Sequence, residues 1–359
     1  MTRNRCRPVG AILVAIAIVI SLAGCVVLPN GSAPASAPVV PAESVLKSTA
    51  LDRALEERIL ALDPDHVTPE DIRDTLSKAP APRIILLHGG VFPVHLAMTS
   101  FAQFLIAMGY PEARIKHPGD DRWSHSPYEP SERVAGMVAW FYEHEGVRPM
   151  MIGHSQGGMQ AIKVLHDLAG TFAPTLPVWN PVTEQAESRT SIVDPITGRE
   201  LPVVGNKVSY TSAVGAGGPS GVLPNQWAVI TRIRDIPDTT LQFDGFFIGI
   251  DWFAMTFTDA GLPRFQSVDG KVEVRNVVLP AGYLHVTVPT THHLPANPAF
   301  RKFIEDYRPA GERPDETTMP GSYSDNVLYA AENWYMIKRH WVLESQRFVR
   351  ARRAAVASN

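Results

Sequence analysis

The chain has 359 residues, 45% of them hydrophobic, and a formal net charge of −3 at pH 7. A chain of this size and apolar content can bury one large core, and its near-neutral charge argues against a nucleic-acid-binding protein. Its two cysteines, Cys6 and Cys25, both lie near the N-terminus. The rest of the chain therefore has no thiol for a disulfide, a cysteine-ligated metal or a cysteine nucleophile.

The first 24 residues are typical of a secretory signal peptide. Three arginines precede an uncharged apolar run, Val9–Leu22, which is shorter than the roughly 20 residues of a comfortable membrane span. The run ends in Leu22-Ala23-Gly24-Cys25, which resembles the lipobox of bacterial lipoproteins. The resemblance implies that Cys25 is lipidated, becomes the first mature residue and anchors the protein outside the cytoplasm, on the periplasmic side of the inner or outer membrane or at the cell surface. An uncleaved N-terminal anchor is the alternative.

Residues 25–42 are rich in proline, alanine, serine and glycine, which predicts a flexible tether. We assign residues 43–359 to the folded domain. Apolar residues three to four apart predict a helix within Glu43–Leu62, either packed on the domain or acting as a spacer.

The next segments lead from a buried strand into a polar loop. The apolar run Arg83–Leu87 predicts a strand that ends in His88-Gly89-Gly90, and Thr99–Gly109 has the pattern of an amphipathic helix. The stretch Lys116–Pro130 contains histidines and aspartates, but their spacing matches no metal-ligand pattern. We therefore expect a loop near the mouth of the site and no bound metal.

The most informative stretch is Met150–Gly158, in which an apolar run leads into Gly153-His154-Ser155-Gln156-Gly157. Helically spaced apolar residues follow over Met159–Leu168, so the pattern predicts a strand, a sharp turn and a helix. In a nucleophile elbow, small residues two positions before and after the serine let strand and helix pass closely. The Ser155 hydroxyl is then exposed, and the Gln156 N–H points to where an oxyanion forms. An ordinary glycine-rich strand–helix connection is the alternative.

With this elbow, the chain after about residue 80 resembles the α/β-hydrolase superfamily. The resemblance implies an α/β fold with a mostly parallel central sheet flanked by helices. It also implies that the loop after the strand at Arg83–Leu87 donates a second oxyanion-hole N–H, from Gly90 or, less favoured, Val91. The superfamily inserts its cap after the next strand, predicted here over Leu176–Val182. Residues 184–237, rich in glycine and proline, are thus expected to form a cap or lid.

The superfamily's catalytic triad follows the chain order serine, acid, histidine. An acid at the end of a buried strand suits the role, and the apolar run Phe246–Ile250 ends in Asp251. Asp251 is therefore the first choice. Asp238 is second, because the residues before it have helical spacing, and Asp235 is third.

The superfamily places its base after the last strand, a few residues before an Asn-Pro or Glu-Pro pair that opens the final helix. A predicted strand over Tyr283–Val288 precedes His292, His293 and an Asn-Pro pair. The spacing favours His292 as the base, with His293 as the alternative. His285 lies inside the predicted strand, so we expect it to be structural.

A last helix is predicted over Asn333–Arg353, with an aromatic face that packs on the domain or lies on anionic lipid. Together the residues predict an esterase-like or lipase-like serine hydrolase acting on a small-molecule or lipid ester, with Ser155, His292 and Asp251 as its triad. No cofactor, metal or nucleic-acid partner is implied. The alternatives are an acyltransferase with the same triad and a catalytically silent binding or scaffold lipoprotein, which the intact elbow disfavours.

Overall fold

The computed structural model describes residues 45–46, 49–91, 94–218, 223–249, 251 and 264–357. The predicted signal peptide and tether, including Cys25, lie outside the described residues. Within the described ranges, no helix is long and apolar enough to cross a membrane.

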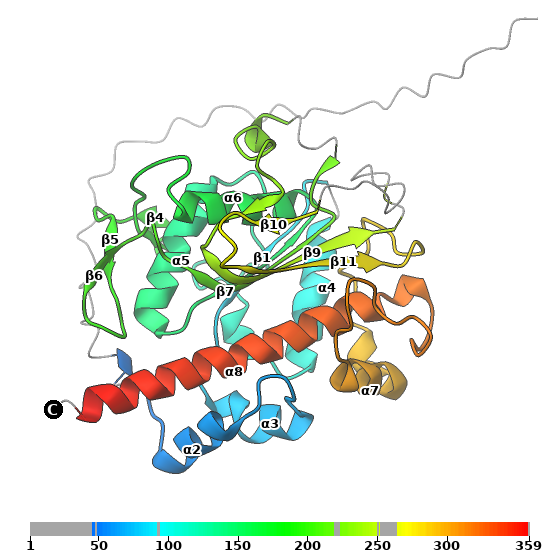
Figure 1. Cartoon of the computed structure of the whole chain (residues 1–359), viewed down its shortest axis with the longest axis horizontal. Helices are drawn as coiled ribbons and strands as arrows, with labels where there is room; N and C mark the ends of the chain where they lie inside the picture. Colours follow the sequence, from blue (N-terminus) through cyan, green and yellow to red (C-terminus); the bar gives the residue numbers. More distant parts are fainter. Residues whose placement is uncertain are drawn as a thin grey trace, which may run out of the picture. The chain divides into compact units, whose positions relative to one another are not determined.

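A five-stranded sheet forms the centre of the domain (Figure 1). Its strands lie side by side in chain order and every neighbouring pair is parallel. All five carboxyl ends therefore meet at one edge. This confirms the predicted α/β class with a parallel central sheet. The strands are β1 (Ile84–Leu87), β2 (Met150–His154), β7 (Val208–Val214), β9 (Thr240–Ile248) and β11 (Glu273–Leu279).

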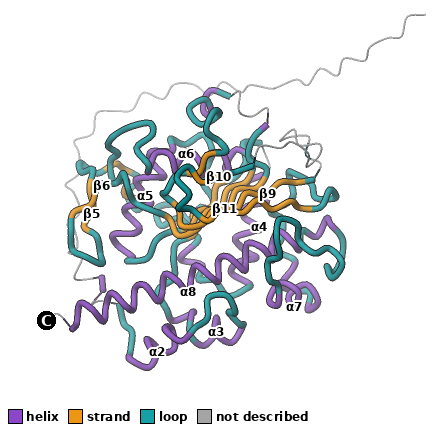
Figure 2. Tube along the Cα trace, viewed as in Figure 1, coloured by secondary structure: helices purple, strands orange, loops and turns teal. Residues whose placement is uncertain are grey.

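Helices cover both faces of this sheet (Figure 2). Successive side chains of a strand point to opposite faces, so Ile84 and Leu86 join one buried cluster while Ile85 and Leu87 join the other. The first cluster lies against α4, α7 and α8, and the second against α5 and α6. These helices are α4 (Val94–Ala107), α5 (Ser131–Glu145), α6 (Gln156–Leu168), α7 (Pro298–Asp306) and α8 (Val327–Ala357).

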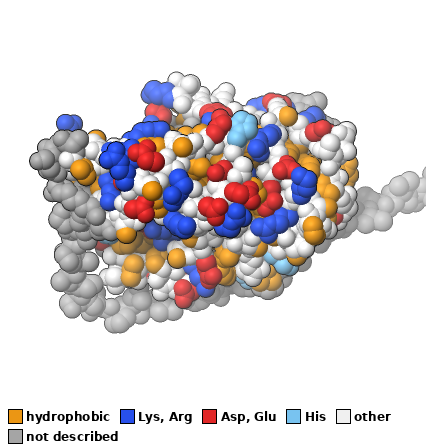
Figure 3. All heavy atoms as spheres, turned by 90° about the horizontal axis from the view of Figure 1, so that it is seen from below, with side chains coloured by type: hydrophobic (Ala, Val, Ile, Leu, Met, Phe, Trp, Pro, Cys, Tyr) orange, Lys and Arg blue, Asp and Glu red, His pale blue; other side chains and the backbone are white. Residues whose placement is uncertain are grey.

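The C-terminal helix α8 packs on the domain. Its Trp334 and Trp341 are fully buried, and Phe348 lies in a third cluster with residues of α2 (Arg53–Ala61). Basic side chains of α8 are paired, as in the Arg353–Glu56 contact at 3.0 Å. Figure 3 accordingly shows basic and acidic side chains intermingled on this side of the molecule. Of the two alternatives predicted for this helix, the structure shows packing on the domain.

The expected cap insertion over residues 184–237 does not match the structure, because β7 lies inside it and pairs with both β2 and β9. The expectation of one continuous insertion is therefore wrong. The strand expected over Leu176–Val182 also stays outside the central sheet. Only Trp179–Asn180 forms a strand there, and it pairs antiparallel with the short strand Gln185–Ala186. The remaining short elements are α3 (Pro69–Asp74), β3 (Trp179–Asn180), β4 (Gln185–Ala186), β5 (Ser191–Val193), β6 (Glu200–Pro202), β8 (Asp235–Ile236) and β10 (Gln266–Ser267).

Candidate active site

Ser155 occupies the sharp turn between β2 and α6. Its backbone angles, φ 56° and ψ −124°, are strained for a residue with a side chain. The flanking glycines make this turn possible. A Cβ at Gly157 would lie 2.1 Å from the Leu87 carbonyl oxygen, and one at Gly153 would lie 2.4 Å from the Gly157 carbonyl oxygen. The predicted strand, turn and helix are therefore present, and both glycine positions exclude any side chain.

Three side chains from separate parts of the chain meet at this turn. The Ser155 hydroxyl lies 2.8 Å from Nε2 of His285, and Nδ1 of His285 lies 2.6 Å from Oδ2 of Asp251. Asp251 and His285 are buried, with 1% and 8% of their surfaces exposed. A buried carboxylate accepts the Nδ1–H of a neutral imidazole, so that Nε2 is the nitrogen that accepts the serine proton. The arrangement can thus activate Ser155 as a nucleophile.

The histidine in this arrangement is His285, and the prediction of His292 is wrong. Nδ1 of His292 lies 2.7 Å from the hydroxyl of Ser100 on α4. The alternative, His293, faces Asp325 at 3.7 Å. Residues 283–288 do not form the expected strand. Residues 285–289 form turns, with Val288 N–H bonded to the Leu284 carbonyl. The loop after the last strand therefore begins at Pro280-Ala281-Gly282, a turn signal that places His285 in that loop.

The structure also separates the candidate acids. Asp251 follows the carboxyl end of β9, at the sheet edge that carries Ser155. Asp238 precedes β9 at the opposite edge, where its carboxylate contacts Lys207 at 2.6 Å. Asp235 accepts a hydrogen bond from the Gln266 side chain at 2.9 Å. The two ends of β9 lie at opposite edges of the sheet. Of the three candidate acids, only Asp251 therefore contacts the imidazole of His285.

The two residues predicted for the oxyanion hole lie against each other. A Cβ at Gly90 would lie 2.3 Å from the side-chain nitrogen of Gln156, and one at Gly89 would lie 3.1 Å from Cβ of Ser155. The glycine loop after β1 therefore sits directly on the elbow. Within the described residues, neither the Gly90 N–H nor the Gln156 N–H has a hydrogen-bond acceptor. Gln156 is the first residue of α6, where N–H groups lack partners inside the helix.

The polar loop Lys116–Pro130 supports this glycine loop. His125 pairs with the end of β1 through two backbone hydrogen bonds, to Leu86 and His88. The Tyr128 hydroxyl donates to the Gly90 carbonyl at 3.0 Å. The loop therefore holds the Gly90 carbonyl in place by a hydrogen bond.

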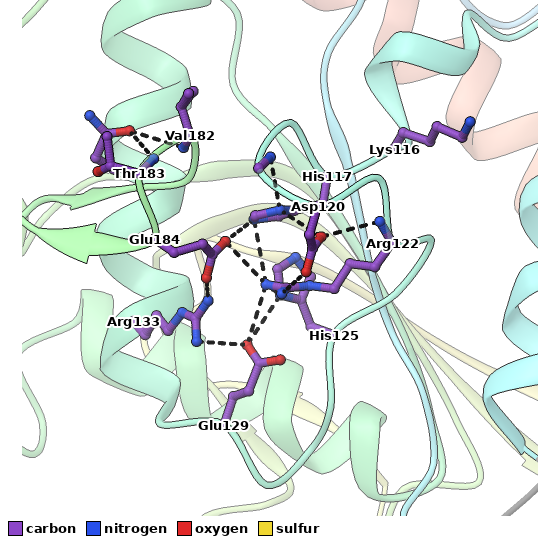
Figure 4. A network of polar contacts seen from close by, with 12 residues as sticks. Lys116, His117, Asp120, Arg122, His125, Glu129, Arg133, Val182, Thr183 and Glu184 are labelled. Atoms are coloured by element: carbon purple, nitrogen blue, oxygen red, sulfur yellow. Dashed lines mark hydrogen bonds and ion pairs between the residues drawn. The ribbon is translucent and has the colours of Figure 1, made fainter. Parts of the chain in front are cut away.

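A network of charged side chains ties this loop to the segment after β3 (Figure 4). Glu184 lies 2.9 Å from Nε2 of His117 and contacts Arg133. Burial lowers the pKa of His117 to about 3. Burial opposes ionisation of Glu129, yet its hydrogen bond with His125 and the nearby arginines lower its pKa to about 2.

Among the described residues, no group of histidines, cysteines and carboxylates is arranged to hold a metal ion.

Sequence reasoning missed two residues that hold the imidazole in place. His154, fully buried beside the serine, has Nε2 at 2.6 Å from the His285 carbonyl oxygen. Burial lowers the pKa of His154 to about 3, so its ring is neutral and donates from Nε2. Gly215, with φ +62°, lies so close that a Cβ there would be 2.9 Å from Nδ1 of His285. The sequence carries a signal for each residue, since His154 lies inside the elbow motif and Gly215 directly follows β7.

Comparison of the chain with protein-family models gives no match, and comparison with curated proteins gives none either. Inference about function therefore starts from the geometry of Ser155, His285 and Asp251.

Proposed function

We propose that the protein is a serine hydrolase of the α/β-hydrolase type that cleaves a carboxylic ester or related acyl bond, as esterases and lipases do. The observation that carries the proposal is the hydrogen-bonded series from Ser155 through His285 to Asp251, with distances of 2.8 and 2.6 Å. The strained serine at the strand–helix turn and the glycine loop beside it support the same conclusion.

In the proposed reaction, Ser155 Oγ attacks the substrate carbonyl while Nε2 of His285 takes the hydroxyl proton. Asp251 holds the imidazole by its Nδ1–H and stabilises the imidazolium. The N–H groups of Gln156 and Gly90 donate to the oxyanion, and a donor of this kind typically contributes about 10²- to 10³-fold in kcat. The imidazolium then gives its proton to the leaving alkoxide. Water repeats the sequence on the acyl-enzyme and releases the acid.

A fluorophosphonate probe tests whether Ser155 is a nucleophile. We expect the probe to label the folded wild-type protein and not Ser155→Ala. Absence of labelling in well-folded wild-type protein would refute the proposal and favour a silent scaffold. Transfer of the acyl group to an added alcohol in preference to water would indicate an acyltransferase with the same triad.

His285 and His292 provide a matched pair of variants for the base. His285→Ala should lower kcat on para-nitrophenyl butyrate by about 10⁶-fold, as removal of a triad histidine does. His292→Ala should retain most activity, because its ring contacts Ser100 and not Ser155. Equal losses in both variants would contradict the assignment of His285.

We also propose that Cys25 carries a lipid that anchors the enzyme to the cell envelope. The lipobox-like Leu22-Ala23-Gly24-Cys25 supports this, because a lipid thioether requires the sulfur. Cys25→Ser should leave the precursor unprocessed or release the protein from membranes. Unchanged membrane partition and unchanged mature mass would refute the anchor while leaving the proposed chemistry intact.

A further inference from the structure

Arg234 is a half-buried cation without a carboxylate partner among the described residues. Its guanidinium carbon lies 4.3 Å from the ring centre of Phe265 and 5.1 Å from that of Phe247. Its Nη1 is buried and has no hydrogen-bond acceptor within the described part of the chain. Burial alone lowers the pKa of Arg234 to about 10, still well above neutrality. The side chain therefore keeps its positive charge inside an apolar surround.

Four other buried or partly buried arginines of this chain have close carboxylate partners. Each contacts a carboxylate at 2.6 to 3.0 Å: Arg83 with Glu145, Arg189 with Glu143, Arg275 with Asp244 and Arg347 with Glu344. Removing a cation from water without a counter-charge is unfavourable, and stacking on aromatic rings offsets this only in part. Arg234 thus has unused capacity to bind an anion.

A second arginine lies at the same aromatic ring. The guanidinium carbon of Arg264 is 5.6 Å from the ring centre of Phe247, and its Nη1 is also buried without an acceptor among the described residues. The other terminal nitrogen of Arg264, Nη2, contacts the Glu312 carboxylate at 3.1 Å. Two guanidinium groups with unsatisfied inner nitrogens therefore share Phe247, and we call them the arginine pair.

Arg234 lies close to the proposed active site. A Cβ at Gly217 would be 3.2 Å from Nη2 of Arg234, whereas one at Gly215 would be 2.9 Å from Nδ1 of His285. These two glycines are two residues apart, which in extended chain is at most about 7 Å. Phe247 lies near the carboxyl end of β9, the strand that leads to Asp251. An anionic group a few bonds from a bound ester carbonyl falls within reach of Arg234.

We propose that the arginine pair binds a negatively charged group of the substrate, so that the enzyme prefers esters that carry a carboxylate or phosphate near the scissile bond. This inference rests on the proposed hydrolase function. Guanidinium groups bind carboxylate and phosphate through paired, charge-assisted hydrogen bonds, which are stronger when shielded from water. In this proposal the acceptors for the arginine pair are oxygens of the substrate's anionic group.

The test compares charged and neutral esters of equal length. The probes are para-nitrophenyl half-esters of succinic, glutaric and adipic acids, each beside the corresponding methyl diester. The wild-type kcat/KM should be higher for at least one charged ester than for its neutral partner. Arg234→Gln should lower this ratio about 10- to 100-fold, the range expected for hydrogen bonds to a charged group. Arg232→Gln, at an exposed neighbouring arginine, is the matched control and should keep the ratio.

Further substrates and inhibitors test on which side of the ester the charged group lies and whether it is a carboxylate or a phosphate. Butyrate esters of phenol and of para-hydroxybenzoate place the charge on the alcohol side, and a preference there that depends on Arg234 supports the proposal equally. Competition of para-nitrophenyl butyrate hydrolysis by inorganic phosphate or by succinate distinguishes phosphate from carboxylate recognition.

The proposal is overturned if the wild-type enzyme prefers no ester with a charge on its acyl or alcohol side and if neither phosphate nor succinate inhibits hydrolysis. These measurements need no variant. A ratio unchanged in Arg234→Gln also overturns it, since the arginine pair then only packs the aromatic rings. Loss of neutral-ester hydrolysis in Ser155→Ala supports the hydrolase itself, so the two failures remain distinguishable.

Discussion

The residue before the serine, His154, is expected to position the catalytic imidazole through the backbone of His285. Its Nε2–H donates to the His285 carbonyl at 2.6 Å in a fully buried setting. His154→Leu removes the donor and leaves this carbonyl unsatisfied, a loss of about 1–3 kcal/mol in the free energy of unfolding. The carbonyl belongs to the proposed base, and a displacement of about 1 Å at reacting groups typically lowers the rate about 10²-fold. We therefore expect kcat to fall about 10²-fold with KM nearly unchanged.

His154→Gln is the matched control, because its amide nitrogen can reach the position of Nε2. It should recover most of kcat, whereas a structural role alone would make both variants equal in rate once both are folded. The assay is steady-state hydrolysis of para-nitrophenyl butyrate between pH 5 and pH 9, with the unfolding temperature measured alongside. The pH profile of kcat/KM should shift in His154→Leu and not in His154→Gln. A His154→Leu variant with kcat within about threefold of wild type would refute the reasoning.

Three further outcomes are expected. Asp251→Asn should keep the fold and lower kcat about 10⁴-fold, whereas Asp238→Asn should remain active in the same ester assay; the reverse pattern would exclude Asp251 as the acid. Gly157→Ala should destabilise the protein by more than about 4 kcal/mol, because the new Cβ overlaps the Leu87 carbonyl, and a normal unfolding temperature would contradict this. Burial, followed by the charge of a neighbouring arginine, lowers the pKa of His340 to about 3 from its usual 6.5. The unfolded chain therefore binds a proton that the folded one does not, and stability should fall by up to about 1.4 kcal/mol per pH unit below pH 6.5. His340→Gln should flatten that slope in urea titrations, and an unchanged slope would exclude this group as its source.

The sequence alone was sufficient where the governing contacts are local. The elbow around Ser155 is specified by glycines two positions away and by the change from an apolar run to helical spacing, all within a few residues. Asp251 was found for a similar reason, because a short apolar strand delivers it to the sheet edge. The parallel α/β class was predicted from the resemblance of this elbow to the α/β-hydrolase superfamily.

Only the tertiary structure determined those features that depend on residues far apart in the chain. His285 was passed over because the residues around it have an apolar alternation typical of a strand, whereas contacts with His154 and Gly215, far away in the chain, fix it as a loop residue. Buried β7 was assigned to a cap because the segment around it is rich in glycine and proline, yet its Ser209, Thr211 and Ser212 are fully buried. Likewise, the sequence shows that Arg234 is charged, but only the fold shows that no described carboxylate reaches it. Periodicity records how a residue relates to its chain neighbours, and these outcomes depend on which segments the fold brings together.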